Sequence, residues 1–147
     1  MTSNGPVVFV VDDDARVRDA LSSLLASAGR EVAAFASATD FLQADKPDAP
    51  ACLVLDLELP DIHGLELQKA LAEREAPPIV FITGHGDVPS SVKAMKAGAV
   101  DFIEKPFDDE VLLSAIRSAL QRRARDSERD AWTTAIKDRI DRLSERE

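Results

Sequence analysis

The chain has 147 residues and a formal net charge of −9, with 45% hydrophobic and 31% charged residues. This length and content suit one globular domain with a short appendage, and no stretch is long and apolar enough to span a membrane. Residues 1–120 hold 20 Asp and Glu against 10 Lys and Arg, and such an acidic body argues against direct nucleic-acid binding by this chain. Cys52 is the sole cysteine and no secretion signal is apparent, which favours a cytoplasmic protein.

Apolar runs and amphipathic segments alternate along the first half of the chain. Val7 to Val11 is a predicted strand, and apolar residues then recur at helical spacing up to Gly29, a natural residue to end a helix. A second strand is predicted over 31–36, with Ser37 as the N-cap of a short helix. The continuous apolar run 52–56 predicts a strand that is buried on both faces of a parallel sheet.

The same alternation continues in the second half. The pattern predicts helices over Leu65–Glu73, Val88–Ala97 and from Asp109 to about Leu120, with strands over 79–83 and 101–104 between them. Parallel strands require crossover connections, and helices supply them here. The predicted fold class is therefore α/β, a doubly wound parallel sheet of five strands flanked by five helices.

Residues 121–147 contain no Gly or Pro and read as a helical extension. Trp132, Ile136, Ile140 and Leu143 form an apolar stripe on this charged segment. The stripe either packs on the domain or pairs with a second copy as a coiled-coil seam, and its short length leaves both interpretations open.

Polar side chains stand at the predicted carboxyl ends of four strands: Asp12 to Asp14, Asp56, Thr83 and Lys105. These ends meet at one edge of an open parallel sheet, which is where such sheets bind ligands. Crowded carboxylates are costly unless a hard cation such as Mg²⁺ offsets them. An aspartate can act as the nucleophile in phosphoryl transfer, while a lysine and a hydroxyl hold the phosphoryl oxygens. We expect Asp12 and Asp13 to face this site and Asp14 to cap the first helix.

Four motifs carry a family resemblance: VVDDD, VLDLELPDIHGLE, ITGHGD and AMKAGAVDFIEKPF. With this spacing, the chain resembles the receiver domain of bacterial two-component response regulators, and particularly the FixJ-type regulators of the NarL/LuxR class. The resemblance implies a flavodoxin-like sheet with strand order 2-1-3-4-5. It assigns residues 1–122 to the receiver domain and residues 123–147 to a helical linker.

The resemblance implies roles for the acidic residues. Asp56 would accept a phosphoryl group from a sensor histidine kinase. Mg²⁺ (or Mn²⁺) would be bound by Asp12, Asp13, Asp56 and the backbone carbonyl of Glu58. Glu58 and His85 stand two residues after Asp56 and Thr83, at positions that tune the lifetime of the phosphoryl group.

The remaining residues of the site are implied to bind the phosphoryl group and to switch. Lys105 would contact the group, and Thr83 would form a hydrogen bond with it. The movement of Thr83 would allow Phe102 to change rotamer. Pro106 would follow a cis peptide bond.

The expected function is a signalling domain rather than an enzyme. Its switched surface, Val88 to Leu120, or the C-terminal helix would form a homodimer. The resemblance also implies a helix-turn-helix effector that binds DNA and is absent from this chain, with no membrane partner.

Two alternatives remain open at this stage. A phosphohydrolase of the haloacid-dehalogenase type also uses an aspartate at a strand end, but it requires a second Asp two residues later, where Glu58 stands. The other alternative is a degenerate receiver that is no longer phosphorylated and only mediates contacts.

Overall fold

The computed structural model describes residues 6–44, 51–73 and 77–122. The elements, in chain order, are β1 (Val7–Val11), α1 (Ala15–Ser27), β2 (Glu31–Phe35), α2 (Ala38–Gln43), β3 (Ala51–Asp56), α3 (Gly64–Ala72), β4 (Ile79–Thr83), α4 (Val88–Lys96) and β5 (Asp101–Glu104). A further helix begins at Asp109 and covers the described residues to 122, and we call it the 109–122 helix.

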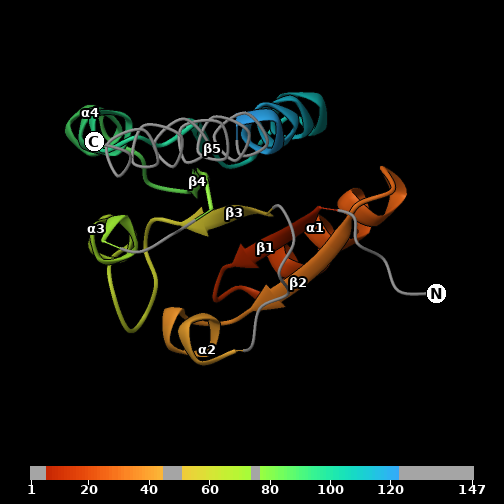
Figure 1. Ribbon diagram of the computed structural model, residues 1–147, viewed down its shortest axis with the longest axis horizontal. Helices are drawn as coiled ribbons and strands as arrows, with labels where there is room; N and C mark the ends of the chain where they lie inside the picture. The colour runs from red at the N-terminus through yellow and green to blue at the C-terminus, as the bar shows by residue number, and fades with distance from the viewer. Residues whose placement is uncertain (1–5, 45–50, 74–76, 123–147) are drawn as a thin grey trace, which may run out of the picture.

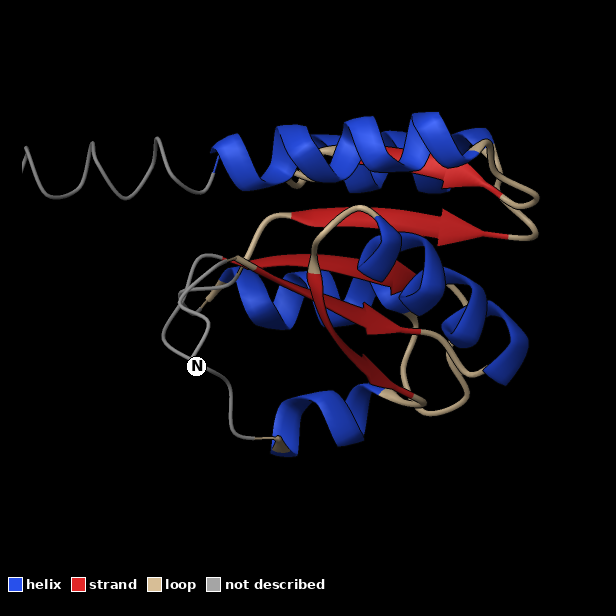
Figure 2. Cartoon of the chain, turned by 90° about the vertical axis from the view of Figure 1, so that its right-hand side faces the viewer, coloured by secondary structure: helices blue, strands red, loops and turns tan. Residues whose placement is uncertain are grey.

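The strands form one parallel sheet in the order β2-β1-β3-β4-β5, which confirms the predicted topology. The register aligns Val11 of β1 with Phe35 and Leu55, and Asp56 of β3 with Ile82. Figure 2 shows the arrowheads of the strands pointing to the same side of the molecule. All carboxyl ends therefore lie at one edge of the sheet, with the loops that follow them.

Alternating side chains of the buried strands supply two separate apolar layers. Figure 1 shows α2, α3 and α4 on one side of the strands and α1 on the other. Phe9, Leu55 and Phe81 belong to the layer under α2, α3 and α4. Val10 and Val54 belong to the layer under α1 and the 109–122 helix. The sheet is thus covered on both faces, as continuous apolar strands require.

Local caps fix several helix boundaries at the predicted residues. Ser37 and Asp87 accept hydrogen bonds from the backbone N–H groups of Asp40 and Ser90, at the starts of α2 and α4. Gly29 follows α1 with a φ of +79°, a conformation that side chains with a Cβ rarely adopt. The predicted ends of the elements agree with the structure to within one or two residues. Differences of this size are usual, because the terminal turns of helices fray.

The predicted extension and its apolar stripe fall within residues 123–147, outside the described part of the chain. Both interpretations of that stripe stay predictions. Among the described helices, none has the length and apolar character needed to cross a membrane.

Candidate functional site

Three carboxylates meet where β1 and β3 end. Asp12 and Asp13 follow β1, and Asp56 is the last residue of β3; each offers an oxygen, and these oxygens lie within 4.8 Å of one another. Asp12 is fully buried and Asp56 is 5% exposed, whereas Asp13 is exposed. The structure therefore brings together the acidic residues that the sequence placed at strand ends.

Asp12 is held on several sides. Its N–H donates to the carbonyl of Phe35 at 3.1 Å, and its Oδ1 accepts from the N–H of Asp14 at 2.9 Å. Asp14 turns away from the acidic site to cap α1, because its side chain accepts from the N–H of Arg16 at 2.9 Å. That hydrogen bond lowers the pKa of Asp14. The run of three aspartates thus divides as expected, with two facing the site and the third capping a helix.

Lys105 supplies the positive charge of the site. Its Nζ lies 2.8 Å from Oδ2 of Asp12 and 3.7 Å from Oδ2 of Asp56. Burial, followed by repulsion from Asp12, raises the pKa of Asp56 to about 6 despite this ammonium. Burial alone would lower the pKa of Lys105, but its hydrogen bond to Asp12 and the nearby carboxylates raise it. The ammonium thus offsets only part of the negative charge.

The acidic cluster fits a magnesium ion by its donor chemistry. All three side chains offer carboxylate oxygens, the ligands that hard divalent cations prefer. Among the described residues, the carboxylate of Asp13 makes no hydrogen bond or ion pair, so its oxygens are available to a ligand. A divalent cation would also relieve the repulsion that raises the pKa of Asp56.

Thr83 and Lys105 come together at the ends of β4 and β5. The N–H of Lys105 donates to the carbonyl of Thr83 at 2.7 Å, and the peptide bond between Lys105 and Pro106 is cis. Thr83 is fully buried, and its Oγ1 accepts from the N–H of His85 at 3.1 Å. The exposed His85 side chain therefore stands in the loop directly after the threonine.

Phe102 is half-buried in β5, with its ring centroid 6.0 Å from that of Phe81. A Cβ on Gly86 would lie 3.0 Å from the ring of Phe102 and 3.0 Å from the methyl group of Thr83. A larger residue at this position of the β4–α4 loop would therefore press on both side chains. From the sequence, Gly84 and Gly86 were expected only to leave this loop open to a partner, so the close approach of Gly86 to Thr83 and Phe102 was missed.

The loop after Asp56 is pinned at both ends. The N–H of the exposed Glu58 donates to Oδ1 of Asp56 at 3.3 Å, and Glu58 forms an isolated β-bridge with His63. A Cβ on Gly64 would lie 2.9 Å from the carbonyl oxygen of Asp56 and 2.9 Å from the Cα of Leu57. Only glycine allows the start of α3 to approach the end of β3 this closely.

Asp61 fastens the same loop to α2. Its Oδ2 accepts from the N–H of Thr39 at 2.8 Å and from the hydroxyl of Thr39 at 2.6 Å. These hydrogen bonds, the hydroxyl's first, lower the pKa of Asp61. The sequence did not predict this contact, because the two residues are 22 positions apart. The only local signal was that Asp61 stands in a turn, where aspartates often accept backbone hydrogen bonds.

Comparison with known proteins agrees with this geometry. The sequence profile described as the response regulator receiver domain matches residues 8–117. Nodulation protein W of Bradyrhizobium diazoefficiens is 47% identical over 146 residues, covering 99% of this chain and 64% of that protein. The chain thus spans slightly less than two thirds of that relative's length.

Two solved structures of response regulators are also similar. The response regulator StyR is 47% identical with a TM-score of 0.83, over 91% of this chain and 68% of StyR. Full-length FixJ from B. japonicum is 43% identical with a TM-score of 0.77, over 95% of this chain and 68% of FixJ.

Proposed function

The chain belongs to the response regulator receiver domain family, and on this premise we propose that Asp56 accepts a phosphoryl group from the phosphohistidine of a sensor kinase. One observation carries the proposal: three carboxylates and the Lys105 ammonium gather at the carboxyl ends of β1, β3 and β5. A purely structural carboxylate cluster would be costly in a core position, since burial and repulsion already raise the pKa of Asp56. A site for a cation and a phosphoryl group accounts for that cost.

In the transfer, an oxygen of Asp56 bonds to phosphorus as the phosphorus–nitrogen bond of the donor breaks, and the electron pair stays on the leaving imidazole. Lys105 is close enough to pair with the negative charge of the phosphoryl group, since its Nζ lies 3.7 Å from Oδ2 of Asp56. The Thr83 hydroxyl, now accepting from the N–H of His85, has a hydrogen left to donate to a phosphoryl oxygen.

Asp12, Asp13, Asp56 and the carbonyl of Glu58 would hold Mg²⁺, with Mn²⁺ as a substitute. When bound, the ion supplies positive charge beside the transferred oxygens. Asp12 is fixed by hydrogen bonds to its N–H, its carbonyl and both of its carboxylate oxygens, whereas the exposed Asp13 is free to reach a ligand. Glu58 and His85 are both exposed, in the loops that follow Asp56 and Thr83, which supports their proposed influence on phosphoryl lifetime.

The switch would run from Thr83 to Phe102. The methyl group of Thr83 and the ring of Phe102 both lie close to Gly86. If Thr83 moves toward the phosphoryl group, its methyl group leaves this space. The half-buried ring of Phe102 can then move inward. The energy for this change comes from the new contacts to Thr83 and Lys105 and from relieved repulsion between the carboxylates.

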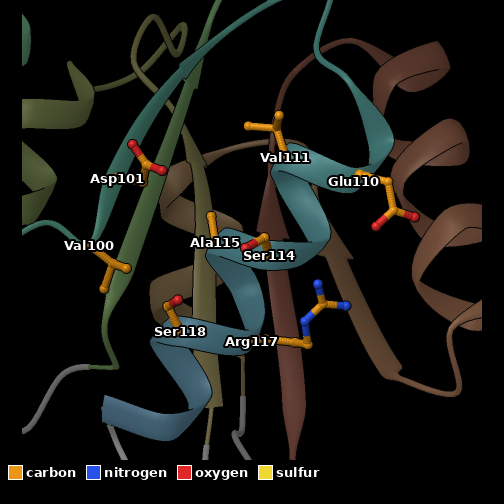
Figure 3. Close-up of a pocket in the computed structure, with 8 residues that line it drawn as sticks. All are labelled: Val100, Asp101, Glu110, Val111, Ser114, Ala115, Arg117 and Ser118. Carbon is orange, nitrogen blue, oxygen red and sulfur yellow. The ribbon is translucent and has the colours of Figure 1, made fainter.

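The surface that responds would pair with a second copy. Val88, Val92 and Met95 of α4 are exposed apolar residues, as is Val111 of the 109–122 helix. A hollow of about 500 Å³ lies between the start of β5 and that helix. Figure 3 shows residues that line it, among them Asp101, Glu110 and Arg117.

This surface suits symmetric pairing, because apolar residues lie next to charges of both signs. Glu110 of one copy can face Arg117 of the other in a two-fold arrangement. The C-terminal segment 123–147 is the other proposed dimer element.

The greater length of the relatives suggests how this domain passes its signal on. We propose that a DNA-binding effector domain follows this chain in the full protein, and that the effector rather than the acidic receiver contacts DNA. Residues 123–147 would then be the linker. A domain that receives its phosphoryl group from an ATP-dependent kinase would act in the cytoplasm.

The test is to incubate the chain with Mg²⁺ and either acetyl phosphate or beryllofluoride, then to measure intact mass and oligomeric state. We expect one adduct per chain in the wild type, loss of the adduct in Asp56→Ala, and dimerisation with the adduct. No adduct would instead indicate a degenerate module. Continuous release of phosphate over many turnovers would indicate a phosphohydrolase.

A matched pair of variants tests the metal assignment. Asp13→Ala should weaken Mg²⁺ binding far more than Asp14→Ala, because Asp14 faces the α1 N-terminus. Equal losses in the two variants would contradict the proposed ligand set.

A further inference from the structure

Arg18 on α1 reaches the acidic site through the backbone. Its Nη1 donates to the carbonyl oxygen of Asp12 at 2.8 Å, and its side chain is half-buried. Among the described residues Arg18 makes no ion pair, although the residue whose carbonyl it contacts carries one of the three carboxylates of the site. Arg16, two residues earlier, differs: its side chain is 93% exposed and lies 3.6 Å from Asp14. The side chain of the half-buried Arg18 is thus bonded to one backbone carbonyl.

That carbonyl belongs to the peptide group that joins Asp12 to Asp13. The orientation of this peptide plane sets where the Cα of Asp13 lies and how its side chain leaves the backbone. The preceding residue is otherwise fixed by the bonds of its N–H and its carboxylate. Asp13 has no such bond from its own side chain among the described residues, so its placement depends on the peptide that Arg18 holds.

We propose that Arg18 is a positioning residue for the divalent cation site, acting on Asp13 through the carbonyl of Asp12. The inference rests on the proposed function, because it takes Asp13 to be a ligand of the cation. Groups that orient ligands from outside the coordination sphere commonly change metal affinity by 10-fold or more when they are removed. A carbonyl bonded to a charged donor is also held more firmly than one bonded to a neutral donor.

The charge of Arg18 and its hydrogen bond should have opposite effects on the affinity for a divalent cation. A guanidinium beside the carboxylates repels a divalent cation, so removing the charge alone should tighten binding. Removing the hydrogen bond should weaken binding, because Asp13 loses its fixed direction. The sign of the change in affinity therefore separates the two roles.

The experiment is a direct Mg²⁺ titration of the chain by calorimetry, repeated with Mn²⁺ by electron paramagnetic resonance. We expect Arg18→Met to weaken binding about 10-fold. Arg18→Lys, which keeps a charge and a donor, should recover part of that loss. Arg16→Met is the matched control, since it removes the same charge from the same helix, and it should leave the affinity unchanged or slightly tighter.

A second readout separates positioning from general damage to the fold. Labelling by acetyl phosphate should need about 10-fold more Mg²⁺ for half-maximal rate in Arg18→Met, yet reach the wild-type plateau. A lowered plateau with an unchanged Mg²⁺ requirement would overturn the proposal. If Arg18→Met does not fold, the comparison of Arg18→Lys with Arg18→Ala, which has no donor, replaces it, with the tighter binding expected for Lys.

The remaining outcomes also decide the matter. Unchanged or tighter binding in Arg18→Met, or a loss that Arg18→Lys does not reduce, would overturn the positioning role. Failure of the proposed function looks different: the wild type itself would bind no Mg²⁺ and form no adduct. Asp13→Ala serves as the reference for complete loss of a ligand.

Discussion

The layer under α1 and the 109–122 helix differs sharply from the opposite side of the sheet, where α4 packs beside α3 and β5. The 109–122 helix buries a full apolar stripe: Leu112, Ala115, Ile116, Ala119 and Leu120. In α4 the one buried residue is Ala94, and its larger apolar residues Val88, Val92 and Met95 are exposed. Burial of apolar area is the main stabilising contribution, so the two helices must be attached with very different strength.

Polar contacts at one end compensate in part for the poor packing of α4. Gln68 of α3 donates to the carbonyl of Ala94 at 2.9 Å, and Arg122 donates to the carbonyl of Gly98, just beyond α4, at 2.8 Å. Both bonds hold the C-terminal end, whereas the N-terminal end continues from the loop that follows Thr83. Elements with few buried apolar residues open locally at low free energy. A movable helix next to a fixed scaffold is the arrangement a switch requires.

The largest predicted effect is the difference between these two helices. Leu112→Ala removes a fully buried side chain of the 109–122 helix and should lower the free energy of unfolding by about 3 kcal/mol. Val92→Ala on α4 should lower it by less than about 0.5 kcal/mol. Denaturant unfolding followed by circular dichroism measures both. A large loss in Val92→Ala would show that α4 is as firmly packed as the scaffold.

A substitution at the acidic edge should raise the free energy of unfolding rather than lower it. The pKa of Asp56 is about 6 in the folded chain, against about 3.9 in an unfolded one. The folded state thus binds the proton more tightly, and the stability due to this group falls as pH rises from 4 to 6. In chelator, Asp56→Asn should therefore raise the free energy of unfolding by about 2 kcal/mol at pH 7 and change it little below pH 4.

Unfolding of wild type and variant at pH 7 and pH 4 checks this sign. Asp19→Asn, which alters an exposed carboxylate of α1, is the control and should change stability little at either pH. A variant that is less stable than wild type at pH 7 would mean that the Lys105 contact outweighs burial and repulsion.

Local patterns predicted the scaffold and the site because each signal lies within a few residues. Ser37 and Asp87 cap helices by accepting hydrogen bonds from N–H groups three residues ahead, and Gly29 follows a helix with a positive φ. Asp12 and Asp56 could be placed together because parallel strands end at the same edge. In each of these cases the sequence spacing and the spatial distance are linked by simple geometry.

The side-chain ties between distant segments had no such signal. Asp61 with Thr39, Gln68 with Ala94 and Arg18 with the carbonyl of Asp12 each depend on rotamers and on how helices sit against the sheet. Neither amphipathic spacing nor a cap motif marks Gln68, which looks like a surface residue of α3 but is only 5% exposed. Its partner is a backbone carbonyl, which carries no sequence information at all.

The smallest predicted effect tests the tie between α3 and α4. Gln68→Leu keeps the size of the side chain but removes the bond to Ala94, whose carbonyl still accepts from the N–H of Ala99 at 3.0 Å. No acceptor is left without a partner, so the free energy of unfolding should fall by only about 1 kcal/mol. Amide exchange should nevertheless accelerate about 5-fold in α4 and stay unchanged in β4, because only the attachment of the helix is weakened. Gln43→Leu, at an exposed position of α2, should leave exchange in α4 as in the wild type. Equal acceleration in β4 and α4 would show that the helix opens only with the whole sheet, and the contrast between scaffold and switch would then be lost.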